Sequence, residues 1–296
     1  RSAKEVPIVT SSALMNISDP VPAITEAGAT GEIAAIFADI RLVLGVDVVN
    51  LIWRHLATIP GALPWAWGTL RPLYADGSIA AEAAALHGDL DLPRLPSFPA
   101  EAFAAAGLLK GDISAIRDIL AAYDRTNAMA LVALSALRRR LEDEPRALDA
   151  ASSHHTDVPP ELPPSILLPS LPSIAELSPT TAELVLILNR LGTRRDNAVL
   201  ASMYRHLAYW PAYLALVWTL IAPLDADGSL DRLIADAVNQ ARERSARLVT
   251  RLRVPSGGPI DSALSTAMRS AMEPFTGDVI AKMVVICAVL RAATSD

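Results

Sequence analysis

An internal repeat constrains the fold of this chain more than any other feature. Residues 53–79 read WRHLATIPGALPWAWGTLRPLYADGSI, and residues 204–230 read YRHLAYWPAYLALVWTLIAPLDADGSL. The two segments align without a gap at an offset of 151 positions, so that Arg54 pairs with Arg205 (205 − 54 = 151) and His55 pairs with His206. Because each copy of such a repeat folds as one structural unit, the chain is predicted to contain two similar halves.

The composition predicts that both halves are helical. Hydrophobic residues make up 52% of the 296 residues, which is ample for a core, whereas aromatic residues make up only 5%. The apolar residues are largely Ala and Leu, which favour helices, and no alternating run of β-branched residues indicates a strand. We therefore expect an all-α protein in which two tandem helical repeats pack as a pseudo-dimer.

A proline-rich segment predicts where the two repeats are joined. Seven prolines lie between Asp157 and Thr180, and a helix interior cannot carry them. The predicted domains are an N-terminal arm at residues 1–25, repeat 1 at 26–142, a linker at 143–179 and repeat 2 at 180–296. The apolar sequence ILLPSLPSI within the linker indicates that it lies along the surface of the body.

Helical periodicity and capping signals predict the individual helices. A first helix begins after Thr30, a predicted N-cap. Asp278 follows Gly277, and we interpret its carboxylate as a cap at a helix start. The other predicted helices span residues 48–59, 63–75, 79–86, 100–107, 111–141, 230–246, 261–273 and 277–292.

Charge and cysteine content exclude several classes of function. A net charge of −6 argues against nucleic-acid binding, and the basic run 138–140 is followed by acidic residues at 142–144, as at a solvated helix end. The single Cys287 lies in an apolar run, where we interpret it as a core residue. No metal or organic cofactor is indicated. No signal sequence or membrane span is visible, so we expect a cytoplasmic protein, and a homodimer remains open.

Four segments resemble a known family over nearly the whole chain from Glu32. They read IRLVLGVDVVNLIWRHLATIPG, IRDILAAYDRTNAMALVALSAL, ASMYRHLAYWP and FTGDVIA. In this order and spacing the chain resembles the group I 2-haloacid dehalogenases, which act on D- and L-2-haloalkanoic acids. The resemblance implies two helical repeats with an active site between them. It also implies a one-step hydrolysis, in which an Asp activates water to displace halide from the carbon beside a carboxylate.

The resemblance assigns roles to particular positions. Ser202 and Asn127 match residues of the family's site, and Ala201 stands where D-specific relatives have Asn and the DL enzyme has Ala. The catalytic Asp falls on Met203, which cannot accept a proton. The aromatic pair that lines the pocket of the family falls on Val48 and Leu51. The scaffold therefore resembles a dehalogenase, whereas most of its catalytic signature is absent.

Differences between the two repeats indicate the same region independently of the family. A site on a pseudo-twofold interface is used asymmetrically, so residues that differ at equivalent positions are candidates for function. Asn50, Leu51 and Ile52 are opposed by Ala201, Ser202 and Met203, and Asn127 is opposed by Asp278 (278 − 127 = 151). We interpret the duplicated Arg-His pair as structural, because His55 repeats the feature where no Ser precedes it.

The long helix that carries Asn127 offers one replacement for the missing base. Tyr123 and Asp124 precede Asn127 by four and three residues, which places them on its face or an adjacent one. Asp124 is the nearby carboxylate that could activate water, so we name it as the candidate catalytic residue. The candidate substrate-binding residues are Ser202, Asn127, Met203, Ala201, Leu51, Val48, Asn50 and Tyr123.

Three functions remain open from the sequence. The first is a hydrolase of the dehalogenase type with altered machinery, acting on a small carboxylic acid held between the repeats. The second is a non-catalytic protein that binds a small carboxylic acid or another small apolar ligand after loss of the base. The third is a structural interaction protein with a filled cleft. Neither nucleic acid nor a membrane is expected as a partner.

Overall fold

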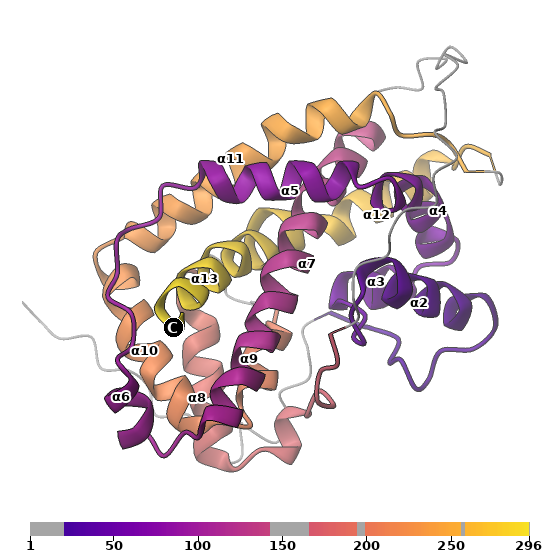
Figure 1. Ribbon diagram of the computed structural model, residues 1–296. Helices are drawn as coiled ribbons and strands as arrows, with labels where there is room; N and C mark the ends of the chain where they lie inside the picture. Colours follow the sequence, from indigo (N-terminus) through magenta and orange to yellow (C-terminus); the bar gives the residue numbers. More distant parts are fainter. Residues whose placement is uncertain (1–20, 143–165, 194–198, 256–257, 296) are drawn as a thin grey trace, which may run out of the picture.

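The computed structural model describes residues 21–142, 166–193, 199–255 and 258–295 (Figure 1). Helices account for the regular structure throughout these ranges, and no strand occurs in them beyond one isolated bridge between Val46 and Ile166. The expected all-α fold is therefore confirmed. The predicted arm and linker lie mostly outside the described residues.

The helices of the first half follow the predicted order. They are α2 (Gly31–Leu44), α3 (Leu51–Leu56), α4 (Ala62–Ala75), α5 (Ser78–Asp89), α6 (Ala100–Ala105) and the long α7 (Lys110–Glu142).

The second half repeats this order after a short 3-10 turn. Its elements are η1 (Ile174–Glu176), α8 (Pro179–Arg190), α9 (Ser202–Leu207), α10 (Pro211–Ala226), α11 (Ser229–Val249), α12 (Ser262–Pro274), the π-helical turn η2 (Phe275–Val279) and α13 (Ile280–Ala293). Helices α3 and α9 begin at Leu51 and Ser202, and α5 and α11 begin at Ser78 and Ser229. Within each pair the two helices start 151 positions apart (202 − 51 = 151), which is the offset of the sequence repeat. This regularity supports the prediction of a pseudo-dimer.

Thr30 is the N-cap of α2, as predicted, although its hydroxyl makes no capping hydrogen bond. Two local predictions were wrong. Residues 48–50 are not helical, because α3 begins only after Asn50, its N-cap. Asp278 does not begin a helix, because α12 continues through the π turn into α13 and buries Asp278 in the middle of that turn. Pro274 and Gly277 look like a helix break in the sequence, whereas the π turn accommodates both within a continuous helical path.

The centre of the molecule is a bundle of four long helices, two from each half. Helices α7 and α13 pack along each other, and both contact α11, while α5 packs on α7 and α11. Figure 1 shows α5 and α11 running side by side next to the crossing of α7 and α13. Helix α13 is apolar around most of its circumference, as expected for a helix enclosed by neighbours on all sides.

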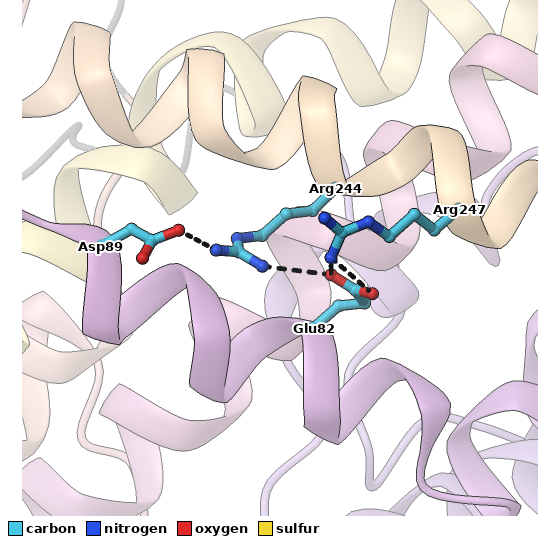
Figure 2. A network of polar contacts seen from close by, with 4 residues as sticks. All are labelled: Glu82, Asp89, Arg244 and Arg247. Atoms are coloured by element: carbon cyan, nitrogen blue, oxygen red, sulfur yellow. Dashed lines mark hydrogen bonds and ion pairs between the residues drawn. The ribbon is translucent and has the colours of Figure 1, made fainter.

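An ion-pair network links α5 to α11 across the two halves (Figure 2). The buried guanidinium of Arg244 contacts Asp89 and lies 3.2 Å from Glu82, and Arg247 also reaches Glu82 at 3.3 Å. A buried charge without a partner costs several kcal/mol, so the two carboxylates of α5 are what allow Arg244 to lie at this interface.

The duplicated Arg-His pairs hold non-helical segments against the body. Arg205 Nε donates to the Pro172 carbonyl at 2.7 Å, and His206 Nε2 lies 3.0 Å from the Pro169 carbonyl. His55 Nδ1 lies 2.7 Å from the Pro22 carbonyl in the equivalent place of the first half. These contacts agree with the structural role predicted for the pair and attach the described part of the linker along the surface.

Within the described ranges, no helix combines the length and the apolar character that a membrane crossing requires.

Candidate functional site

A narrow cavity of about 50 Å³ lies between the two halves, where α3, α7, α9 and the π turn meet. One enclosed water needs roughly 10 to 15 Å³ on this measure, so the cavity suits a molecule of only a few heavy atoms. All eight candidate substrate-binding residues line it, although they come from three separate stretches of the chain: Val48, Asn50, Leu51, Tyr123, Asn127, Ala201, Ser202 and Met203.

Two polar side chains fix the loops that bring α3 and α9 to the cavity. Glu26 accepts a hydrogen bond from the backbone N–H of Val49 at 2.9 Å and pairs with Arg41 at 2.6 Å. Asn189 has the same role in the second half. Its Oδ1 accepts a hydrogen bond from the Ala201 N–H at 3.0 Å, and its Nδ2 donates one to the Val199 carbonyl at 3.2 Å. The walls of the cavity are therefore anchored independently in each half.

The π turn contributes a wall that the sequence did not reveal. Phe275 and Val279 of this turn line the cavity, together with Ile280 and Met283 of α13. A π turn widens the helix by one residue per turn and is frequently found at functional sites. The equivalent segment of α7 is a regular helix, so the turn makes the cavity asymmetric between the halves.

A chain of hydrogen bonds leads from the cavity wall into the core. The Tyr123 hydroxyl lies 2.7 Å from His206 Nδ1, and the side chain of Ser202 is also hydrogen-bonded to Tyr123. Burial lowers the pKa of His206 to about 4, so the imidazole is neutral near pH 7. Its Nε2–H then donates to the Pro169 carbonyl, and its Nδ1 accepts a hydrogen bond from the Tyr123 hydroxyl.

Met203 lines the cavity at the position where the resemblance implies a catalytic Asp, and the thiol of Cys287 contacts its thioether. The Cys287 Sγ lies 3.2 Å from the Met203 Sδ, and the Asn127 amide nitrogen lies 3.9 Å from the same Sγ. Burial raises the pKa of the Cys287 thiol well above its ordinary value, so the sulfur stays protonated. This agrees with the interpretation of Cys287 as a core residue.

The described lining of the cavity contains no acidic or basic side chain. Positive charge nevertheless reaches it from behind the wall, because Arg205 and Arg54 both act to lower the pKa of Tyr123, against a larger rise caused by burial. The cavity is thus apolar in its lining, with neutral amides and hydroxyls as its polar groups and two guanidinium groups nearby.

The structure brings Asp124 to a different place from the other candidates. Its buried carboxylate pairs with Arg291 of α13 and lies 3.2 Å from His87 Nε2 of α5, and it does not line the cavity. A rotation of about 100° per residue separates Asp124 from Tyr123 on α7, which turns one side chain to the cavity and the other to the bundle. This geometry gives Asp124 no contact with a molecule in the cavity.

Several cavity residues were not among the candidates. Leu168 comes from the linker and Thr126 precedes Asn127. The remaining residues are apolar and come from α3, α7, the π turn, α13 and the loops. The one sequence signal for this region was the motif FTGDVIA, which begins at Phe275. In the described part of the chain, no group of three His, Cys, Asp or Glu side chains could hold a metal ion.

Comparisons with known proteins agree with the fold. No family model matches the chain. Two solved structures of D-2-haloacid dehalogenase, a complex with L-LA and a mutant, superpose with a TM-score of 0.69 at 16% identity; they cover 92% and 93% of this chain and 95% and 96% of their own. Such low identity establishes the shared fold alone.

A curated relative is more similar in sequence. The "2-haloacid dehalogenase, configuration-inverting" of Alcaligenes xylosoxydans xylosoxydans is 30% identical over 227 residues, which cover 75% of each chain. With this identity over three quarters of both proteins, the chain belongs to the 2-haloacid dehalogenase family.

Proposed function

We propose that this protein binds a small 2-substituted carboxylic acid in the cavity between its halves, without hydrolysing it through a carboxylate base. The observation that carries the proposal is the lining of the cavity, which offers neutral hydrogen-bond donors and apolar walls but no carboxylate in its described part. The relative acts, by its description, on 2-haloacids, which are small acids of this kind.

The polar groups suit a bound carboxylate. Ser202, Asn127 and Asn50 each carry a hydroxyl or amide donor and lie on the cavity wall. The guanidinium groups of Arg54 and Arg205 add a favourable potential for an anion, as their effect on Tyr123 indicates. A neutral pocket with positive charge behind it lets a carboxylate enter without pairing directly with a cation.

The apolar groups suit a short substituent and disfavour water activation. Met203 is fully buried against Cys287, so the position of the family's base presents a thioether to the ligand. Asp124, the candidate replacement, is paired with Arg291 away from the cavity. General-base catalysis requires a proton acceptor within hydrogen-bond reach of the attacking water, directly or through one further water.

One observation favours hydrolysis as a second candidate function. The hydrogen bonds from Ser202 through Tyr123 to His206 could carry a proton from a water in the cavity to His206 Nδ1. Water would then attack the carbon beside the carboxylate, halide would leave with the bonding electrons, and the proton would end on the imidazole. Since the pKa of His206 is about 4, the imidazole is a weak acceptor near pH 7, which ranks this function second.

Chloride release from racemic 2-chloropropionate separates the two functions. We expect the unmodified protein to bind the acid in a calorimetric titration and to release no chloride above a blank. The variant Met203→Asp restores a carboxylate to the cavity floor and is expected to release chloride measurably, whereas Met203→Leu, the matched apolar control, is not. Turnover by the unmodified protein that disappears in Tyr123→Phe would contradict the binding proposal and favour the relay.

A further inference from the structure

A second hollow, of about 400 Å³, opens between the C-terminal part of α7, the middle of α11 and the π turn. It is lined by Arg138 and Arg139 of α7 and by Arg242 of α11, together with hydroxyl side chains that include Ser135 and Thr276. Glu142 is the carboxylate among its described lining residues. Three guanidinium groups thus face one carboxylate in a concave site.

Among the described residues, the arginines of this hollow have fewer carboxylate partners than those on the neighbouring face of α11. On that face Arg247 pairs with Glu82, and Arg244 pairs with Glu82 and Asp89 (Figure 2). For Arg242 and Arg139 the described part of the chain contains no ion pair, and both side chains are exposed. Helix α11 therefore carries paired arginines on its side towards α5 and, at the hollow, one without an ion pair to any described residue.

Arg138 is held in position to serve as the back of a binding site. Its Nη1 donates to the Thr276 hydroxyl at 2.6 Å, and its Nη2 lies 4.0 Å from Glu142. These two contacts fix the Arg138 guanidinium at the wall of the hollow.

Other causes account for only part of this arrangement. Arginines near the C-terminus of α7 interact favourably with the helix dipole, which explains Arg138 and Arg139 in part. Arg242 lies well inside α11, so the dipole does not explain it. Its position opposite the α7 arginines concentrates positive charge in the hollow.

We infer that this hollow is a binding site for the phosphate group of a small molecule. A phosphate ester carries about −1.5 to −2 charges near neutral pH, which matches three guanidinium groups opposed by one carboxylate. Guanidinium groups bind phosphate oxygens in a bidentate manner, and arginines of two helices can reach one such group from different sides. The hollow lies apart from the acid-binding cavity, so this site does not depend on the function proposed above.

Thermal unfolding and calorimetric titration with inorganic phosphate test this site. Ionic strength is kept constant with sodium chloride, so that non-specific screening does not change. We expect saturable stabilisation of the unmodified protein by phosphate. Arg242→Gln is expected to weaken phosphate binding about tenfold or more, as loss of a charge-assisted hydrogen bond requires. Arg247→Gln removes the same charge from the same helix outside the hollow and is expected to leave the affinity unchanged.

Equal affinities of Arg242→Gln and Arg247→Gln, or no stabilisation beyond that by chloride, would overturn the assignment. If Arg242→Gln does not fold, Arg139→Gln serves instead, because Arg139 is exposed and lies on the other helix of the site. A parallel titration with phenyl phosphate identifies the kind of phosphate that binds. Tighter binding of phenyl phosphate than of inorganic phosphate would assign an organic phosphate to the site, and equal binding would assign the free ion.

Discussion

At the scale of single residues, the site is defined by which atoms can exchange a proton. Met203 places a thioether where the resemblance implies a carboxylate, with the Cys287 thiol beside it, and the Tyr123 hydroxyl donates a hydrogen bond to a neutral imidazole. The same few residues therefore decide between binding and hydrolysis. Two predictions concern the residues His206 and Asp124.

His206 is expected to make stability fall as the pH is lowered through the mildly acidic range. Its pKa is about 4 in the folded protein, against an ordinary value of 6.5, because burial disfavours the charged imidazole. The unfolded chain therefore binds the proton first as the pH falls from about 6.5 to 4, which removes about 3 kcal/mol from the free energy of unfolding. Urea denaturation at a series of pH values measures this loss.

The variant His206→Gln is the control for that measurement. It lacks the titrating ring, so its stability is expected to change less than that of the unmodified protein between pH 6.5 and 4. Parallel pH profiles for the two proteins would mean that His206 does not titrate in this way.

Asp124→Asn is expected to lower stability without changing ligand binding. The substitution weakens a buried ionic contact with Arg291, which costs about 1 to 3 kcal/mol. Because the side chain does not line the cavity, the affinity for 2-chloropropionate in a calorimetric titration should stay within about twofold. Asn127→Ala, three residues along the same helix, should reduce the affinity instead. A large loss of affinity in Asp124→Asn would restore this residue as a site candidate.

At the scale of elements, the two halves are joined through helices that pair across the repeat. The contact of α5 with α11 depends on one buried arginine and two carboxylates (Figure 2). The contact of α7 with α13 is mostly apolar, and it is enlarged by the π turn that lines the cavity. The elements that stabilise the molecule thus also position the site.

Arg244→Gln is expected to lower the free energy of unfolding by about 2 kcal/mol, as loss of hydrogen bonds to charged groups requires. Arg244 is buried, and its removal leaves Asp89 without this partner at the α5–α11 contact. Arg247→Gln, with a side chain 69% exposed, should cost less than about 1 kcal/mol. Urea denaturation of both variants makes the comparison. Equal costs would show that burial does not set the strength of this network.

At the scale of the whole molecule, a ligand between the halves acts on both of them together. The cavity is lined by α3 and α7 of the first half and by α9, the π turn and α13 of the second. A ligand that binds only the folded protein stabilises it by mass action, whatever the chemistry that follows.

2-Chloropropionate at 100 times its dissociation constant is expected to stabilise the protein by about 2.7 kcal/mol, which raises the melting temperature by several degrees. Differential scanning calorimetry measures the shift, with sodium chloride at equal ionic strength as the blank. The variant Asn127→Ala should need a higher concentration of 2-chloropropionate to reach the same shift in melting temperature. A filled cleft, which the third function from the sequence requires, would give no shift in either protein.

The sequence determined the helical fold and indicated eight of the residues that line the cavity. The offset of 151 positions aligned Leu51 with Ser202 and Asn127 with Asp278, and the side chains that differ between the copies indicated where the two halves are used asymmetrically. This worked because helical periodicity and a repeat register are local properties, which the order of residues fixes without tertiary contacts.

Only the tertiary structure decided the rest. The ion pair of Asp124 with Arg291, the hydrogen bond of Tyr123 with His206 and the hydrogen bond of Arg138 to Thr276 in the π turn each join residues more than 80 positions apart. The same holds for the unbalanced arginines, because a sequence gives the number of charges but not which carboxylate each one meets. The partner of a side chain, its burial and its pKa are decided by segments that are distant in the sequence and pack together in the fold.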